Sequence, residues 1–409
     1  MYAVRVLYLH QHFTTPKGAG GTRSYEMSRR LIQAGHQVTM VCGSYQGGHT
    51  GLDGAYVGGR RRGHIEGIDV IELELPYGNT DGFFKRSLTF VRFALRTLSV
   101  VLREPCDVIF ATTTPLTVAI PAVVAKWLRR KPFVFEVRDL WPELPRAMGV
   151  ITNPVVLGGM RVLEWVAYKV ADRHVALAPG IQRGIESDGI SSTSIALIPN
   201  SCDVDEFARP SAAWRPAGTG DGDFLAVYAG THGLANGLDA LVDVAEELQR
   251  RGRLDIFLVL VGQGAAKAGL KEQIAERRLT QLLLLHPVKK HDVVNVLHGA
   301  DVGIQCLANV PAFYEGTSPN KFFDYLAAGL PVIINYPGWV ASLIDEQGCG
   351  VAVPPGNPVA FADALERMAA DPMALAAMAA QARRLAETRF HRDALGDQFV
   401  RWLEEVAQS

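Results

Sequence analysis

The segment at residues 314–335 reads YEGTSPNKFFDYLAAGLPVIIN and has the pattern of a loop, a helix and a strand. Ser318 suits the N-cap of this helix, and Pro319 suits its first position because the φ of proline is already helical. Lys321 then falls in the first turn, where a cation is unusual because a helix N-terminus already carries partial positive charge. Free amides beside a lysine favour an anion, so the segment predicts a diphosphate site in the C-terminal half of an α/β nucleotide-binding fold. The alternative for these residues alone is an amphipathic helix with a solvated Lys321 and Asp324.

The same segment resembles the signature of the retaining GT-B glycosyltransferases, in the large family 4-like group whose motif is Glu-x7-Glu followed by A-x-G-x-P-V. Counted back from AAGLPV, Asp324 takes the second Glu position, which in that family holds the ribose of a sugar nucleotide. The first position, which contacts the transferred sugar, falls on Gly316, with Glu315 one residue out of register. The P-x-K pattern of Pro319 and Lys321 is similar to the branch that builds bacterial surface polysaccharides. The resemblance implies two doubly wound, Rossmann-like parallel-sheet domains that face a cleft.

Length and composition agree with two α/β domains. The chain has 409 residues, 48% of them hydrophobic and 20% charged, which allows two large cores and does not indicate disorder. A net charge of −1 argues against a nucleic-acid partner. Five cysteines stand far apart without a C-x-x-C pair, so buried free thiols in a reducing compartment are expected rather than a zinc site. The N-terminus has no signal-peptide pattern, and no apolar run reaches the roughly 18 residues of a membrane span, which predicts a cytoplasmic protein, with peripheral attachment to the inner face of the membrane as an option.

Strands and helices alternate along the chain, which predicts parallel sheets covered by helices. Strands are expected at residues 4–9, 35–42, 68–74, 107–111, 133–137, 174–178, 195–198, 224–230, 256–264, 282–288, 302–307 and 332–335. Residues 208–223 are rich in Pro, Gly and Ala and read as a linker. We therefore expect two domains, at 1–207 and 224–387, and the resemblance implies that the first faces the acceptor and the second binds the nucleotide sugar. The resemblance suggests that the last helix, at 388–409, packs back on the first domain.

The N-terminal half offers two candidate stretches after predicted strands. Gly20 and Gly21 allow a close backbone approach to a phosphate, although a tight turn explains them equally well. A dinucleotide site would require an acid at the end of the second strand, and CGS at 42–44 has none, so NAD binding is disfavoured. Arg138 and Asp139 follow the strand at 133–137, where Arg suits a phosphate or sugar hydroxyl and Asp an acceptor hydroxyl. A surface ion pair is the alternative.

The C-terminal half has a glycine loop, THGLANG at 231–237, after its first strand. Most of the resembled family has Arg and Lys here to neutralise the diphosphate, and the matching residues are the uncharged Thr231 and Asn236, with His232 beside them. Another cation must then offset the phosphate charge. Lys321 is the predicted one, with Arg138 or Arg23 as helpers.

Two further patterns each have two readings. Asp203-x-Asp205 can mark a metal site, but the resemblance to the family's P-N-G-V-D-x-x-x-F turn explains the same residues, and no metal cofactor is expected. The stretch 83–103 interleaves apolar residues with Lys and Arg and contains no acid, so it suits an anionic membrane interface or an ordinary packed helix with a basic outer face.

Together with the family resemblance, these features predict a glycosyltransferase of the hexosyl or N-acetylhexosaminyl type, and the resemblance implies retention and no required metal. It would move a sugar, with retention, from a nucleotide-diphosphate sugar to a hydroxyl of a glycan or lipid-linked acceptor in cell-surface polysaccharide biosynthesis. A sugar-nucleotide epimerase of the same fold and a non-catalytic nucleotide-sugar-binding protein are the alternatives. The predicted catalytic residues are Lys321, Arg138, Asp139 and Glu315. The predicted donor-binding residues are Gly20, Gly21, Thr231, His232, Asn236, Gly262, Gly264, Ser318, Asn320 and Asp324.

Overall fold

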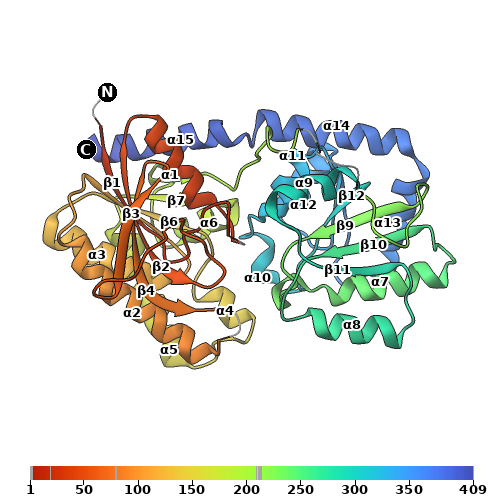
Figure 1. Cartoon of the computed structure of the whole chain (residues 1–409), viewed down its shortest axis with the longest axis horizontal. Coiled ribbons are helices and arrows are strands. Elements are labelled where there is room, and N and C mark those ends of the chain that lie inside the picture. Colours follow the sequence, from red (N-terminus) through yellow and green to blue (C-terminus); the bar gives the residue numbers. More distant parts are fainter. Residues whose placement is uncertain (1–2, 19, 79–80, 209, 211–213, 409) are drawn as a thin grey trace. The chain divides into compact units, whose positions relative to one another are not determined.

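The chain forms two compact units in the computed structural model, which describes residues 3–18, 20–78, 81–208, 210 and 214–408. The N-terminal unit comprises Met1–Pro199, Gly316–Ser318 and Asp393–Ser409. The C-terminal unit comprises Asn200–Glu315 and Pro319–Arg392. Figure 1 gives the elements of each unit with the labels used below.

The N-terminal unit contains an eight-stranded sheet in the order β3-β4-β2-β1-β5-β6-β7-β8. All neighbouring strands are parallel except β3 and β4. The strands are β1 (Arg5–Leu9), β2 (Gln37–Tyr45), β3 (Arg60–Ile65), β4 (Ile68–Tyr77), β5 (Val108–Thr112), β6 (Phe133–Val137), β7 (Arg173–Ala176) and β8 (Ile195–Leu197). β5 and β6 are buried along their whole length, as expected for central parallel strands covered on both faces.

The edge strand β3 is absent from the sequence prediction. Its sequence, RRRGHI, has no alternation of apolar and polar residues. The strand pairs with β4 through the antiparallel backbone ladder and through ion pairs between side chains. Arg61 pairs with Glu72, and Arg62 pairs with Asp69 across the two strands. Cross-strand ion pairs of this kind are invisible to a search for hydrophobic periodicity.

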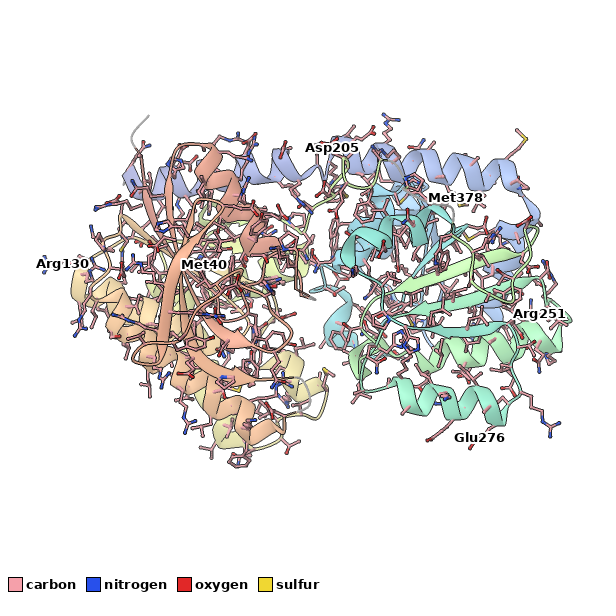
Figure 2. All side chains as sticks on the ribbon, in the orientation of Figure 1. Met40, Arg130, Asp205, Arg251, Glu276 and Met378 are labelled. Carbon is pink, nitrogen blue, oxygen red and sulfur yellow. The ribbon has the colours of Figure 1, made fainter. Side chains whose placement is uncertain are left out.

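Helices cover both faces of this sheet. Helices α2, α3 and α5 pack side by side, while Figure 1 shows α1 on the other side of the strands. The helices are α1 (Arg23–Gln33), α2 (Phe83–Val101), α3 (Ala119–Arg129), α4 (Glu143–Ala147), α5 (Pro154–Val170), α6 (Pro179–Ser187) and α15 (Arg392–Gln408). Met40, in the middle of β2, is completely buried, whereas Arg130 lies exposed just after α3 (Figure 2).

The C-terminal unit contains a fully parallel six-stranded sheet in the order β11-β10-β9-β12-β13-β14. Its strands are β9 (Phe224–Ala229), β10 (Ile256–Val261), β11 (Leu282–Leu285), β12 (Val302–Gln305), β13 (Val332–Ile334) and β14 (Gly350–Ala352). Its helices are α7 (Asp239–Arg250), α8 (Lys267–Glu276), α9 (Lys290–His298), α10 (Pro311–Tyr314), α11 (Asn320–Ala327), α12 (Trp339–Gln347), α13 (Pro358–Ala370) and α14 (Pro372–Thr388). Alternate residues of β9 and β10 enter separate apolar clusters on the two faces of the sheet. The predicted pair of doubly wound parallel sheets is therefore confirmed.

The division of the chain falls after Pro199, earlier than the composition suggested. Residues 200–207 pack with the C-terminal unit, because the Cys202 amide donates to the Phe390 carbonyl at 2.7 Å and His298 contacts the Phe207 carbonyl at 2.9 Å. The last helix, α15, packs in the N-terminal unit. There Trp402 donates to the His174 carbonyl at 3.1 Å, and Phe399 meets Phe110 edge-on at 5.0 Å between ring centroids.

All five cysteines are buried free thiols, as predicted. Among the described residues, none of the helices combines the length and the apolarity that a bilayer crossing requires.

Candidate active site

Each sheet reverses its strand order at one place, and α/β folds bind ligands beyond the carboxyl ends of the strands at such a place. In the N-terminal unit the reversal lies between β1 and β5, and in the C-terminal unit between β9 and β12. The chain leaves these strands at His10, Thr113, Gly230 and Cys306. Most of the predicted site residues lie close to these exits.

In the N-terminal unit a cavity of about 290 Å³ opens at the carboxyl ends of the parallel strands. Four predicted residues line it together: Gly20, Gly21, Arg138 and Asp139. Its wall also contains residues that the sequence analysis did not single out, namely His10, His12, Tyr77 and Arg86.

The two histidines of this cavity are held as neutral rings. Arg138 Nη1 lies 3.4 Å from His10 Nε2, and since a guanidinium only donates, His10 Nδ1 carries the proton and donates to Ser24 Oγ at 2.5 Å. His12 Nδ1 donates to the Thr114 carbonyl at 2.8 Å, and His12 Nε2 accepts from the Tyr77 hydroxyl. Burial lowers the pKa of His10 well below its usual value and the pKa of His12 to about 4, and the nearby Arg138 charge acts in the same direction. Neither ring therefore adds positive charge near pH 7.

Asp139 is the acid of this cavity. Burial raises the pKa of its carboxyl, opposed by the neighbouring Arg138 charge and by a hydrogen bond from Thr114 Oγ1 at 3.2 Å. Thr114 thus holds two groups in place, because its carbonyl orients His12 and its hydroxyl orients Asp139. A carboxyl with a raised pKa is suited to accept a hydrogen bond from a substrate hydroxyl, or to exchange its proton.

The buried position of Arg23 argues against its predicted role as an additional cation for the diphosphate. Its side chain is 3% exposed and pairs with Glu136, whose side chain is 0% exposed. The guanidinium also donates to the carbonyls of Pro199 at 2.7 Å and Ile198 at 2.9 Å. Its hydrogen-bonding groups are occupied within the core of the unit, so it is unavailable to a diphosphate.

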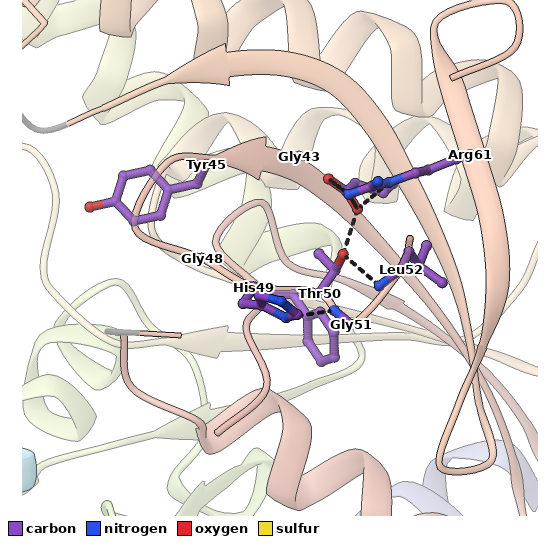
Figure 3. A pocket seen from close by; sticks show the side chains of 10 residues that line it. Gly43, Tyr45, Gly48, His49, Thr50, Gly51, Leu52 and Arg61 are labelled. Carbon is purple, nitrogen blue, oxygen red and sulfur yellow. Dashed lines mark hydrogen bonds and ion pairs between the residues drawn. The ribbon is translucent and has the colours of Figure 1, made fainter. Parts of the chain in front are cut away.

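A second, smaller pocket of about 100 Å³ shares Tyr45 and Gly48 with the first. Figure 3 shows that its charged groups bond to each other, since Glu72 accepts from Thr50 Oγ1 and from Arg61. The Thr50 hydroxyl in turn accepts from the Leu52 amide at 3.4 Å. These contacts hold the loop after β2 in place, and they pair the charges of Arg61 and Glu72 with each other rather than with a ligand.

Lys321 is the second residue of α11 in the C-terminal unit, in the first turn as predicted. Its ammonium lies 4.7 Å from the centroid of the Tyr228 ring, and a Cβ at Gly230 would come within 2.7 Å of Lys321 Cε. Within the described part of the chain the ammonium makes no hydrogen bond and no ion pair, and burial lowers its pKa to about 8. An anion placed here would restore the charged form.

His232 and two glycines form a tight backbone junction beside Lys321. A Cβ at Gly262 would lie 1.8 Å from the Gly230 carbonyl oxygen, and a Cβ at Gly264 would lie 2.3 Å from the His232 carbonyl oxygen. Only glycine fits at either position. His232 is fully buried with no hydrogen-bond partner for either ring nitrogen among the described residues, and burial, together with Lys267 and Lys321, lowers its pKa to about 4.

Thr231 and Asn236 shape the loop after β9 and bring no charge to it. The Thr231 carbonyl accepts from the Tyr228 hydroxyl at 2.7 Å and from Asn236 Nδ2 at 2.9 Å. Lys267 is a cation near this loop. Its ammonium already donates hydrogen bonds to the carbonyls of Gly262 at 2.7 Å and Leu285 at 2.5 Å.

The predicted start of the α11 helix is wrong by one residue. The helix begins at Asn320, and Pro319 is its N-cap, with extended dihedral angles of φ −77° and ψ 123°. Ser318 therefore lies before the cap, and the N-cap residue Pro319 makes no side-chain hydrogen bond to the helix. Asn320 is exposed at the first helical position.

Asp324 and Glu315 occupy different surroundings in the C-terminal unit. Asp324 is half-buried one turn after Lys321, and its charge helps to keep the Lys321 ammonium protonated. Glu315 ends α10, and its Oε1 lies 3.4 Å from the position of a Cβ on Gly338, the N-cap of α12. A carboxylate near a helix N-terminus is electrostatically favourable.

The Asp203-x-Asp205 pattern forms a turn. Asp203 pairs with Arg392, and its Oδ1 accepts from the Glu206 amide at 3.2 Å. Among the described residues, no group of three or more His, Cys, Asp and Glu side chains could hold a metal ion.

The missed residues His10 and His12 did leave a signal in the sequence. LHQHF at 9–13 places two histidines directly after a predicted first strand, at the edge where α/β sites form. Arg86 had no such signal, because it belongs to a helix in which several basic residues alternate with apolar ones.

Two family models match the chain in succession. The description "Glycosyl transferase 4-like domain" matches residues 18–201, and "Glycosyl transferases group 1" matches residues 213–385. The curated alpha-D-kanosaminyltransferase of Streptomyces kanamyceticus is 26% identical over 204 residues, which are 50% of this chain and about half, 51%, of that protein.

Solved structures show the same fold over the whole chain. Sucrose-phosphate synthase from Thermosynechococcus elongatus superposes with a TM-score of 0.76 at 18% identity, covering 99% of this chain and 100% of that one. HepE from Anabaena, solved in complex with UDP-glucose, superposes with a TM-score of 0.67 at 16% identity, covering 98% of this chain and 100% of that one. The chain therefore belongs to the family 4-like glycosyltransferases with the GT-B fold.

Proposed function

We propose that this glycosyltransferase moves a hexosyl or N-acetylhexosaminyl group, with retention of configuration, from a nucleotide-diphosphate sugar to a hydroxyl of a glycan or lipid-linked acceptor in cell-surface polysaccharide biosynthesis. The observation that carries the proposal is Lys321, a partly buried ammonium without a hydrogen bond or ion pair among the described residues, at the strand-order reversal of the C-terminal sheet. The UDP-glucose bound by HepE supports a nucleotide-sugar donor.

We assign each candidate residue one role in the transfer of the sugar. Negative charge grows on the departing diphosphate, and Lys321 with the amides of the Gly262 and Gly264 loop would stabilise it. Asp324 would hold the ribose hydroxyls, and Glu315 would contact the transferred sugar. In the N-terminal cavity Arg138 would bind a phosphate or a hydroxyl, and Asp139 would bind a hydroxyl of the acceptor. No metal is required in this scheme.

The proposed function is tested by incubating the protein with UDP-, GDP- and dTDP-sugars and a lipid extract, with and without EDTA. NMR should show one donor consumed only when acceptor is present, the anomeric configuration kept, and the rate unchanged by EDTA. Isomerisation of a donor alone would identify an epimerase. Binding of donors without turnover under every condition would identify a non-catalytic protein.

Replacing Asp324 with alanine is expected to weaken UDP binding by about tenfold or more, because a charged hydrogen-bond acceptor to the ribose contributes roughly 1.5–3 kcal/mol. Isothermal titration calorimetry measures the effect. The matched control is Asp345→Ala, which removes an exposed carboxylate of α12. Equal UDP affinity in Asp324→Ala and the parent protein would remove the ribose assignment.

We also propose a cytoplasmic location with peripheral binding to an anionic membrane through α2. The helix carries no acid in its first turn, and it exposes Phe84, Leu88, Val91 and Leu95 beside Arg92 and Arg96. An apolar stripe with flanking cations suits the headgroup region of an anionic bilayer.

The double substitution Phe84→Ser with Leu88→Ser is expected to reduce binding to vesicles by several-fold, because it removes two apolar anchors. Sedimentation with vesicles of 70% phosphatidylcholine and 30% phosphatidylglycerol measures it, and high salt should weaken parent binding by screening. Met373→Ser, an 85% exposed residue of α14, is the control. Failure of the parent protein to sediment with these vesicles would reject the membrane contact.

A further inference from the structure

Two guanidinium groups in the 290 Å³ cavity of the N-terminal unit have no carboxylate hydrogen-bond partner among the residues that the structure describes. Arg86, from α2, is half-buried and its side chain makes no hydrogen bond or ion pair with the residues that the structure describes. Among the described residues, the hydrogen-bond partner of the Arg138 guanidinium is His10 Nε2, at 3.4 Å. Partly buried cations of this kind are costly unless an anion joins them, and guanidinium groups are well matched to phosphate.

Other arginines of the same unit show the contrast. Arg61 bonds to Glu72 and Arg161 bonds to Glu164 and Asp188, so their charges are neutralised within the protein. In the cavity the histidines are neutral, and Asp139 is the acid among the lining residues. With Arg86 and Arg138 opposing that single acid, the lining carries a net positive charge.

Helix α2 relates this cavity to the exposed apolar stripe. Arg86 and Phe90, one turn apart, lie on the cavity side, where the Phe90 ring is 5.8 Å from Tyr77 and 6.1 Å from His12. Phe84 and Leu88 lie on the opposite side of the helix and are 89% and 50% exposed. The same two turns of helix therefore offer a cation to the cavity on one face and apolar surface on the opposite face.

We propose that this cavity binds a phosphate group of the acceptor through Arg86 and Arg138. The acceptor is a phosphorylated amphiphile whose apolar chain leaves along Phe84 and Leu88. The inference rests on the proposed function and adds the chemical class of the acceptor. Lys321 would bind the diphosphate of the donor, whereas a phosphate site and an exposed apolar face on the same two turns of α2 suit a lipid-linked substrate.

The test uses the full chain with geranyl phosphate as the probe, kept below its critical micelle concentration, and with geraniol, inorganic phosphate and UDP for comparison. Isothermal titration calorimetry should show that Arg86→Gln weakens geranyl phosphate binding by about ten- to hundredfold, the usual effect of losing one charge-assisted contact. Arg86→Lys should recover part of the loss. The control Arg92→Gln removes an exposed cation of the same helix and should leave geranyl phosphate binding unchanged.

The comparisons with geraniol, inorganic phosphate and UDP show whether the cavity binds a lipid phosphate, free phosphate or the donor diphosphate. Geraniol should bind at least tenfold more weakly than geranyl phosphate, inorganic phosphate should bind more weakly than geranyl phosphate, and UDP binding should be equal in Arg86→Gln and the parent. Equal geranyl phosphate affinity in Arg86→Gln and the parent would overturn the proposal. An equal loss of UDP and geranyl phosphate binding would assign the cavity to the donor and also overturn it. Absence of UDP binding to the parent counts against the proposed function, and the geranyl phosphate comparison still decides the cavity.

Discussion

Replacing Lys321 with alanine is expected to lower kcat by about 100- to 1000-fold, the effect of removing one group that stabilises developing charge in a transition state. Lys321 packs against Tyr228 and Gly230, and its ammonium makes no hydrogen bond or ion pair with the described residues. Its positive charge is therefore available for the leaving diphosphate, and the uncharged Thr231 and Asn236 cannot replace it. Steady-state transfer kinetics measure the loss.

The fold should survive this substitution, because the ammonium makes no hydrogen bond with the described residues that folding would lose. Far-UV circular dichroism and the melting temperature check this point. The control is Lys271→Ala, an exposed lysine of α8 that should leave kcat unchanged. A Lys321→Ala protein with parental kcat would exclude charge stabilisation by this residue.

Replacing Arg23 with alanine is expected to destabilise the protein by about 3–5 kcal/mol, because Glu136 would remain as a buried, unpaired carboxylate. The pair is almost fully buried, and Arg23 also satisfies the carbonyls of Ile198 and Pro199. Urea unfolding followed by tryptophan fluorescence measures the change.

A surface pair of the same helix is the control for Arg23. Arg29 pairs with Glu66, and their side chains are 32% and 53% exposed, so Arg29→Ala should cost less than about 1 kcal/mol. An Arg23→Ala protein with parental stability and reduced turnover would show that Arg23 acts on the substrate, contrary to its place in the structure.

The sequence was sufficient for the fold because its strands are nearly continuous apolar runs. VIFAT and FVFEV are completely buried, and such runs leave few alternatives to a parallel sheet. The edge strand β3 was missed for the opposite reason, since ion pairs hold it.

The sequence drew attention to Lys321 and the glycines as candidates, because each departs from what an ordinary helix or strand requires. A lysine in the first turn of a helix and glycines at strand ends are local signals. Arg86 and Arg23 carried no local signal. Their roles depend on which groups the fold places around them, the residues of the N-terminal cavity for Arg86 and Glu136 for Arg23.

The helix start shows the limit of local rules. Ser318-Pro319 matches a common N-cap and first-turn pair, yet the backbone at Pro319 is extended and the helix begins at Asn320. Element boundaries of one or two residues depend on the packing around them, which the local sequence does not contain.

The central claim is that the charge of Lys321 binds the donor diphosphate, and the pH dependence of UDP binding tests it most directly. The pKa of Lys321 is lowered to about 8, so the ammonium is present below this pH and is lost as the pH rises through it. Calorimetry should show UDP affinity falling between pH 7 and pH 9.5 in the parent protein, and a flatter profile in Lys321→Arg, whose guanidinium stays charged. The same profile in both proteins, with no loss of affinity above pH 8, would contradict the account.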